Sequence, residues 1–123
     1  MASPGPRRVL VVEDDPDLRE ALCELLSDRH AEAHGVADGQ QAVYYLMAEP
    51  APRAIVLDLR LPLINGWDLL AWLRGEPACR DVPVVVVSGA PIERLELALD
   101  HAPIAWLQKP IDPRALRQVV AAL

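Results

Sequence analysis

Short runs of consecutive apolar residues recur along the chain, separated by longer segments with a different pattern. An uninterrupted apolar run of four or five residues is typical of a strand buried on both faces, as in a parallel sheet. Gly35 weakens the pattern of one further candidate strand. The predicted strands are Val9–Val12, Ala33–Val36, Ala54–Leu57, Val84–Val87 and Ile104–Leu107.

The segments between these runs carry apolar residues three and four positions apart, which is the spacing of one helix face. Asp15 before Pro16, and Asp112 before Pro113, each place a capping carboxylate before a proline at the first helical position. Strand and helix therefore alternate, which predicts an α/β doubly wound fold with helices on both faces of a parallel sheet. The apolar stripes of the five expected helices are Leu18–Leu26, Ala42–Met47, Leu69–Leu73, Leu95–Leu99 and Leu116–Leu123.

The size and net charge of the chain exclude several classes of function. The chain has 123 residues, the size of one domain, and 52% of them are hydrophobic. The formal net charge of −6 argues against nucleic acid and against anionic membrane surfaces as partners. No apolar run approaches the ~20 residues of a membrane helix. Residues 1–7 are expected to form a flexible tail and residues 8–123 one domain. Without a secretory signal, a cytoplasmic location with reduced Cys23 and Cys79 is expected.

Polar side chains follow the predicted strands at the points where those strands end. Glu13 and Asp14 follow the first apolar run, Asp58 and Ser88 follow later runs, and Lys109 comes after the last. In an open parallel sheet, ligands bind outside the carboxyl ends of the strands. We therefore expect carboxylates, a hydroxyl and an ammonium group to meet at one edge of the sheet.

Carboxylates that gather at one edge need a cation. If Glu13, Asp14 and Asp58 lie within about 4–5 Å, each pair repels by roughly 3–4 kcal/mol at an effective dielectric constant of about 20. Oxygen-only ligands favour a hard cation such as Mg²⁺, which often shares a phosphate oxygen. Lys109 and Ser88 suit a phosphoryl oxygen. The expected chemistry is in-line attack of the Asp58 carboxylate on phosphorus, with Mg²⁺ and Lys109 absorbing the developing charge.

Together these motifs resemble the receiver domain of two-component response regulators. Each motif is weak alone, but four in this order with helix-sized gaps form a specific signature. The resemblance implies a flavodoxin-like doubly wound fold, with five parallel strands in the order 2-1-3-4-5 and five helices. It spans about Arg8–Leu123, and its parts are Val11–Asp15, Leu57–Pro62 with Gly66, Val87–Gly89, and Lys109–Pro110.

The resemblance also implies a metal site and a phosphoacceptor. It implies that Asp58 accepts the phosphoryl group and also binds Mg²⁺. Asp14 is then a direct metal ligand, whereas Glu13 acts mostly through water. The backbone carbonyl of Arg60 is implied as a further ligand. Our own hypothesis is that the Arg60 guanidinium pairs with Glu13 or with the phosphate and alters the phosphate lifetime.

Ser88, Lys109 and Trp106 receive roles in the same way. The resemblance implies that Ser88 moves toward a phosphoryl oxygen, and that Lys109 pairs with the phosphate and has a cis bond to Pro110. Trp106 stands where the family usually has a Tyr or Phe that swings inward, so Ser88 and Trp106 are the expected switch residues. An indole is larger than either of those rings, which leaves the movement of Trp106 open.

The expected function is signalling rather than enzymatic turnover of a substrate, although the domain would promote its own phosphorylation and dephosphorylation. The implied phosphodonor is a phosphohistidine on a sensor histidine kinase or on a histidine phosphotransfer protein. The downstream partner is an unidentified protein, and a homodimer through the last strand and the last two helices is possible. The alternative is a docking or dimerisation module that works without phosphate.

Two other classes fit the residues less well. An aspartate-nucleophile phosphatase needs a second acid two residues after the nucleophile, where this chain has Arg60. A flavin-binding module on the same fold would want a phosphate loop after the first strand, where Glu13, Asp14 and Asp15 would repel the phosphate.

Overall fold

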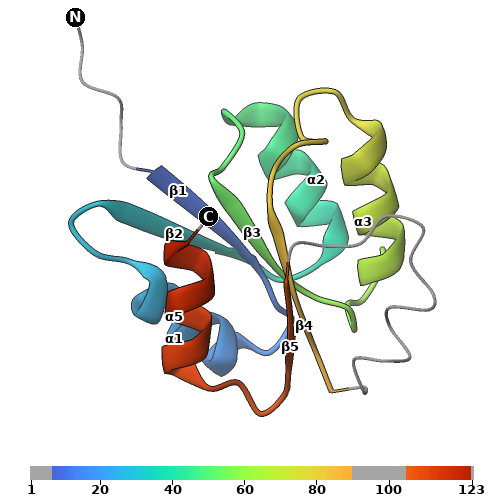
Figure 1. Ribbon diagram of the computed structural model, residues 1–123. Helices are drawn as coiled ribbons and strands as arrows, with labels where there is room; N and C mark the ends of the chain where they lie inside the picture. The colour runs from blue at the N-terminus through green and yellow to red at the C-terminus, as the bar shows by residue number, and fades with distance from the viewer. Residues whose placement is uncertain (1–6, 90–104, 123) are drawn as a thin grey trace, which may run out of the picture.

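The computed structural model describes residues 7–89 and 105–122, which form a twisted sheet with helices on both faces (Figure 1). The strands are β1 (Arg7–Val12), β2 (Ala31–Val36), β3 (Ala54–Asp58), β4 (Val84–Ser88) and β5 (Ala105–Gln108). The helices are α1 (Pro16–Leu26), α2 (Gly39–Ala48), α3 (Gly66–Gly75) and α5 (Pro113–Ala121). The helix expected around Leu95 and Leu99 lies outside the described residues.

The five strands are all parallel and lie in the order β2-β1-β3-β4-β5, which confirms the expected topology. Gly35 does not interrupt β2, because its backbone stays in register with Val11 of β1. Every residue of β3 and β4 is buried. These two strands are covered on both faces, as their continuous apolar sequences predict. The first strand begins at Arg7, one residue inside the expected tail.

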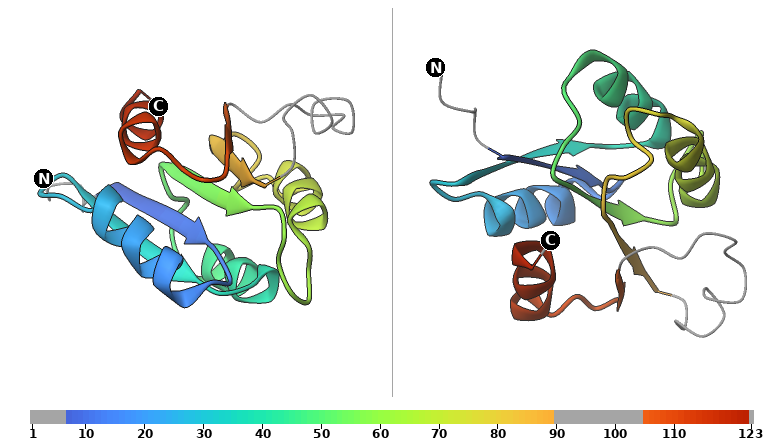
Figure 2. Two further views of the ribbon diagram at one scale, coloured as in Figure 1. Left: turned by 90° about the horizontal axis from the view of Figure 1, so that it is seen from below. Right: turned by 45° about the horizontal axis from the view of Figure 1, so that its top comes forward.

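Alternate side chains of the strands enter two separate cores. On one face, α1 and α5 pack against residues such as Val9, Val11 and Val85. On the other face, α2 and α3 pack against residues such as Leu10 and Ile55. Figure 2 shows this division, with the sheet between the two helix pairs. The layers leave the carboxyl ends of the strands as the open edge where the chain can place polar groups.

Side-chain caps begin the helices that follow the site strands. The Asp15 carboxylate accepts hydrogen bonds from the amides of Asp17 and Leu18 at the start of α1. Asp112 accepts one from the amide of Arg114 at the start of α5. Both caps confirm the predicted starts, and each satisfies amides that a helix leaves without partners in its first turn. Among the described helices, none could serve as a membrane-spanning segment.

Candidate functional site

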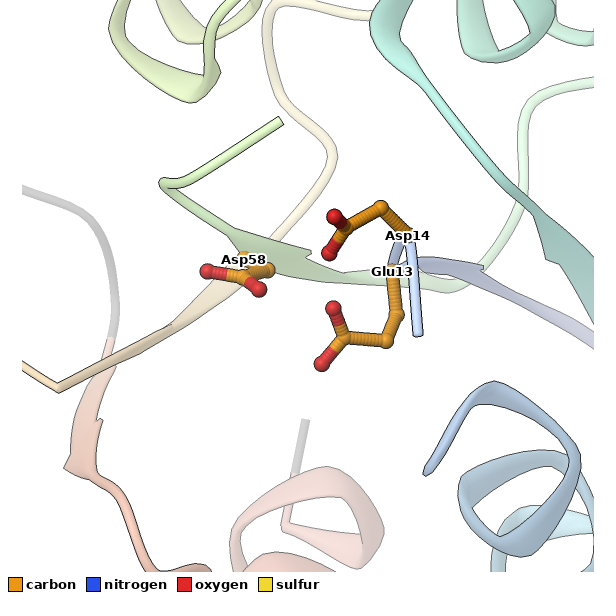
Figure 3. A group of neighbouring side chains, drawn as sticks. All are labelled: Glu13, Asp14 and Asp58. Carbon is orange, nitrogen blue, oxygen red and sulfur yellow. The ribbon is translucent and has the colours of Figure 1, made fainter. Parts of the chain in front are cut away.

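Three carboxylates from the ends of β1 and β3 converge at the open edge of the sheet. One oxygen each from Glu13, Asp14 and Asp58 lies within 4.8 Å of the other two. Figure 3 shows the three side chains gathered around one space, two of them rising from the end of β1 and the third from β3. The register explains the meeting, because Val12 pairs with Leu57 and the next residue of each strand carries a carboxylate. Glu13 and Asp58 are buried, whereas Asp14 is exposed.

The only lysine of the chain bridges two of these carboxylates. The Lys109 Nζ atom lies 2.9 Å from Asp58 Oδ2 and 3.0 Å from Glu13 Oε1. Its backbone amide donates to the carbonyl of Ser88 at 2.8 Å, which ties the end of β5 to the end of β4. The peptide bond from Lys109 to Pro110 is cis, as the resemblance implied. The predicted convergence of residues from distant strand ends on one edge is therefore found.

Burial and like charge set the protonation of this cluster. Removal from water, together with contact with Asp58, raises the pKa of Glu13 to about 7, while Lys109 acts in the opposite direction. Burial alone would lower the pKa of Lys109, but its hydrogen bonds to Asp58 and Glu13 outweigh this and raise it. The ammonium group therefore stays charged and offsets part of the repulsion between the carboxylates.

The cluster has the donor set of a Mg²⁺ site. Glu13 Oε2 is buried and, within the described part of the chain, has no hydrogen-bond partner. A buried carboxylate oxygen without a partner is costly, and a divalent cation with the waters that it keeps would supply the missing contact. The donors are all oxygen atoms, and Asp14 opens the cluster to solvent, which suits an ion that keeps several of its waters. The residues present therefore fit Mg²⁺.

The loop after β3 holds Asp58 from the other side. The Arg60 amide donates to Asp58 Oδ1 at 3.0 Å, so the two carboxylate oxygens have different partners. Gly66 then brings the start of α3 against the strand end, with its amide 3.1 Å from the Leu59 carbonyl. Between them, Leu63 takes a left-handed backbone conformation at φ 67° with its side chain 76% exposed. The sequence pattern indicated the loop but not this strained leucine.

The remaining predicted site residues lie at the same edge or next to it. Ser88 is buried at the end of β4, directly after the residue that pairs with Asp58. Trp106 is half-buried in β5 and packs against the core under α2 and α3. The Arg60 side chain is exposed, and no ion pair joins it to Glu13, whose described cationic partner is Lys109. The structure therefore does not contain the pairing of Arg60 with Glu13 that the hypothesis gave as one of its two alternatives.

One contact to the site was missed from the sequence. The guanidinium of Arg19, on α1, donates to the backbone carbonyl of Glu13 at 3.0 Å. An arginine on an exposed-looking helix turn gives no sequence signal of such a contact, because the contact depends on how α1 lies against the sheet.

Comparisons with known proteins bear on the family of the chain. Residues 9–121 match the family described as the response regulator receiver domain. The chain belongs to this receiver-domain family. It is 35% identical over 115 residues to the protein Rrf1 of Nitratidesulfovibrio vulgaris. The aligned region covers 94% of this chain and 80% of that protein. A phosphate regulon transcriptional regulatory protein, PhoB of Escherichia coli, is 34% identical over 112 residues, or 89% of this chain.

The solved structures give the same assignment. The receiver protein from Pseudomonas putida, described as a response regulator, superposes with a TM-score of 0.87 at 28% identity, covering 98% of this chain and 100% of that one. The receiver domain described here spans 48% of PhoB, so what PhoB does as a whole protein does not transfer to this chain. The shared part is the receiver domain.

Proposed function

We propose that this receiver domain accepts a phosphoryl group on Asp58 in a Mg²⁺-dependent reaction and thereby changes a protein-binding surface. One observation carries the proposal: three carboxylates from two strand ends share one space, and the Lys109 ammonium binds two of them. Such a cluster is stable only with cationic neighbours, and one lysine does not neutralise three carboxylates. A divalent cation would balance the remaining negative charge, and together with Lys109 it would offer an incoming phosphoryl group two cationic partners.

Asp58 has the properties of a poised nucleophile. Its side chain is only 5% exposed, and its two oxygens are oriented by different donors, the Lys109 ammonium and the Arg60 amide. In the proposed step, an Asp58 oxygen attacks the phosphorus of a phosphohistidine. The new P–O bond forms as the P–N bond breaks, and the imidazole leaves with the electron pair and takes up a proton. Because the carboxylate is already oriented, less ordering is needed at the moment of reaction.

The cations of the site, Mg²⁺ and Lys109, would neutralise the negative charge of the transferred phosphoryl group. When bound, Mg²⁺ would neutralise part of the charge on the phosphoryl oxygens. It would be held by Asp14 and Asp58 and the Arg60 carbonyl, with Glu13 acting through water. Lys109 would exchange a carboxylate contact for one to a phosphoryl oxygen, and Ser88 would donate its hydroxyl to another. Two such charge-assisted contacts, each worth about 1.5–3 kcal/mol, approach the roughly 5.5 kcal/mol that a nearly complete two-state switch needs.

The partners follow from this chemistry. The phosphodonor would be a sensor histidine kinase or a histidine phosphotransfer protein, and the acceptor of the signal a downstream protein. We place the switching surface at β5 and α5, where Trp106 would respond to the movement of Ser88. Dimerisation through the last strand and the last two helices stays a prediction, since part of that face lies outside the described residues. A cytoplasmic location is likewise a prediction.

Binding of beryllofluoride, a phosphoryl mimic, separates this proposal from a docking module that ignores phosphate. We expect beryllofluoride with Mg²⁺ to bind to the wild-type domain and to shift the backbone amide resonances of β5 and α5. Neither component alone should do so, and Asp58→Asn should abolish the response. A wild-type domain that binds Mg²⁺ but not beryllofluoride would favour the phosphate-independent module. Binding without shifts in β5 and α5 would leave phosphorylation in place and reject the switching surface.

A further inference from the structure

Arg19 closes the turn that carries the metal-binding carboxylates. Its backbone amide donates to the Asp15 carbonyl at 2.8 Å, and its guanidinium donates to the Glu13 carbonyl at 3.0 Å. The Glu13 amide in turn donates to the Val36 carbonyl of β2 at 3.1 Å. Both backbone polar groups of Glu13 therefore have partners outside β1. The backbone on either side of Asp14 is held by the same arginine.

Gly35 provides the space in which the Arg19 stem lies. A Cβ atom added to Gly35 would lie 2.8 Å from Arg19 Cγ, 3.0 Å from Arg19 Cδ and 3.1 Å from Cys23 Sγ. A glycine inside a strand weakens the strand, and a close approach by another group is a usual reason for it. Because the stem rests on the strand at this glycine, the guanidinium is held in place and loses little freedom when it binds the carbonyl.

We propose that Arg19 is a positioning residue for the metal-binding turn, with Gly35 as the seat of its side chain. The inference rests on the proposed function, because it concerns the same Mg²⁺ site. Mg²⁺ demands near-octahedral geometry, so its carboxylate ligands must be held at the right separation. The Arg19 contact fixes the direction of the Glu13 carbonyl and hence the path of the chain through Asp14. Groups that orient metal ligands in this way typically affect metal affinity by about 10–100-fold.

Charge and geometry make opposite predictions for Arg19, which makes the proposal testable. As a cation near the carboxylates, Arg19 repels Mg²⁺, so removing its charge would tighten Mg²⁺ binding if it acted only through its field. As a positioning residue, it favours binding. A purely structural role would change the stability of the fold without changing the Mg²⁺ affinity of the folded protein.

The experiment measures the Mg²⁺ dissociation constant by calorimetry on the folded domain, at a temperature below the unfolding transition of each variant. We expect Arg19→Met to weaken Mg²⁺ binding about tenfold and Arg19→Lys to restore only part of the loss, because an ammonium lacks the planar fork. Arg29→Met is the matched control, since Arg29 is exposed, and it should bind Mg²⁺ as the wild type does. Unchanged or tighter binding by Arg19→Met would overturn the proposal.

Gly35→Ala supplies a second test that leaves the arginine in place. The added methyl group should displace the Arg19 stem and weaken Mg²⁺ binding, whereas in an Arg19→Ala background the same change should have no further effect on the affinity. Equal effects of Gly35→Ala in both backgrounds would contradict the proposed seat. If the wild-type domain itself did not bind Mg²⁺, the proposed function would fail and this inference with it. If the wild-type domain bound Mg²⁺ and the Arg19 variants bound it with the same affinity, this inference alone would be rejected.

Discussion

Lys109 and Asp58 are 51 residues apart in the chain, yet their charged groups lie 2.9 Å from each other at the edge of the sheet. The same ammonium reaches Glu13, so a single side chain from the loop after β5 links the ends of β1 and β3. This relationship makes the site one electrostatically coupled unit rather than three independent carboxylates, and several measurable consequences depend on it.

Removal of the Lys109 charge should destabilise the domain and make it more dependent on Mg²⁺. Lys109→Met leaves buried Glu13 and Asp58 without their cation, and we expect the free energy of unfolding to fall by about 1–3 kcal/mol without Mg²⁺. Part of that loss should be recovered when Mg²⁺ is added. Urea unfolding with and without the ion measures both effects, and Lys109→Arg is the control that keeps the charge. If the Lys109→Met variant were as stable as the wild type without Mg²⁺, Lys109 would not be the cation that stabilises the buried carboxylates.

The exposed Arg60 side chain should affect how long the phosphoryl group survives. Arg60 follows Asp58 by two residues, and its guanidinium is not committed to Glu13. It is therefore available to cover the phosphoryl group against attack by water. We expect Arg60→Ala to shorten the lifetime of the phosphorylated domain several-fold and Arg60→Lys to do so less. The loss of acetyl-phosphate-derived label over time measures the rate. An unchanged rate in the Ala variant would remove Arg60 from the account.

Gly66 should not tolerate any side chain. A Cβ atom there would lie 2.4 Å from the Leu59 Cα and 2.9 Å from the carbonyl oxygens of Asp58 and Leu59, all of them backbone atoms. We expect Gly66→Ala to lower the free energy of unfolding by about 3 kcal/mol or more. Gly75, at the end of the same helix, is the control, because a Cβ atom there meets nothing within 4 Å. Gly75→Ala should be neutral or stabilising by about 0.5–1 kcal/mol in the same denaturation experiment. Equal changes in the free energy of unfolding would contradict the close approach of Gly66 to the backbone of Asp58 and Leu59.

At position 63, glycine should give a more stable protein than alanine, which is the reverse of the usual order. Leu63 has a φ of 67°, which is costly for any residue with a Cβ atom, by roughly 1–2 kcal/mol. Its side chain is exposed, so truncation removes little packing. We expect Leu63→Gly to be about 1 kcal/mol more stable than Leu63→Ala, although alanine is the more stable residue wherever the backbone is ordinary. Thermal unfolding of the two variants compares them directly, and a more stable Ala variant would mean that the loop relaxes.

The sheet and the acidic edge were predictable because they depend on patterns that are local in sequence. Uninterrupted apolar runs identify β3 and β4, and the polar residue after each run marks the edge at which strand ends meet. The convergence of Asp58 with Lys109 then follows from parallel pairing rather than from any single motif.

Other features depend on how elements pack and have no local pattern. The Arg19 contact to Glu13 needs the orientation of α1 on the sheet, and the left-handed Leu63 is a residue type that sequence rules would not place there. The direct bond between Glu13 and Lys109 was not foreseen either, because the resemblance assigned Glu13 to the metal through water and Lys109 to the phosphate.

The central claim is tested most directly by phosphorylation of the domain with a small donor. The domain is incubated with acetyl phosphate and Mg²⁺, and its intact mass is measured. We predict the gain of one phosphoryl group in a linkage that is stable to acid and labile to base, absent without Mg²⁺ and absent from Asp58→Ala. A gain that persists in Asp58→Ala, or a wild-type domain that gains no mass, would contradict the account.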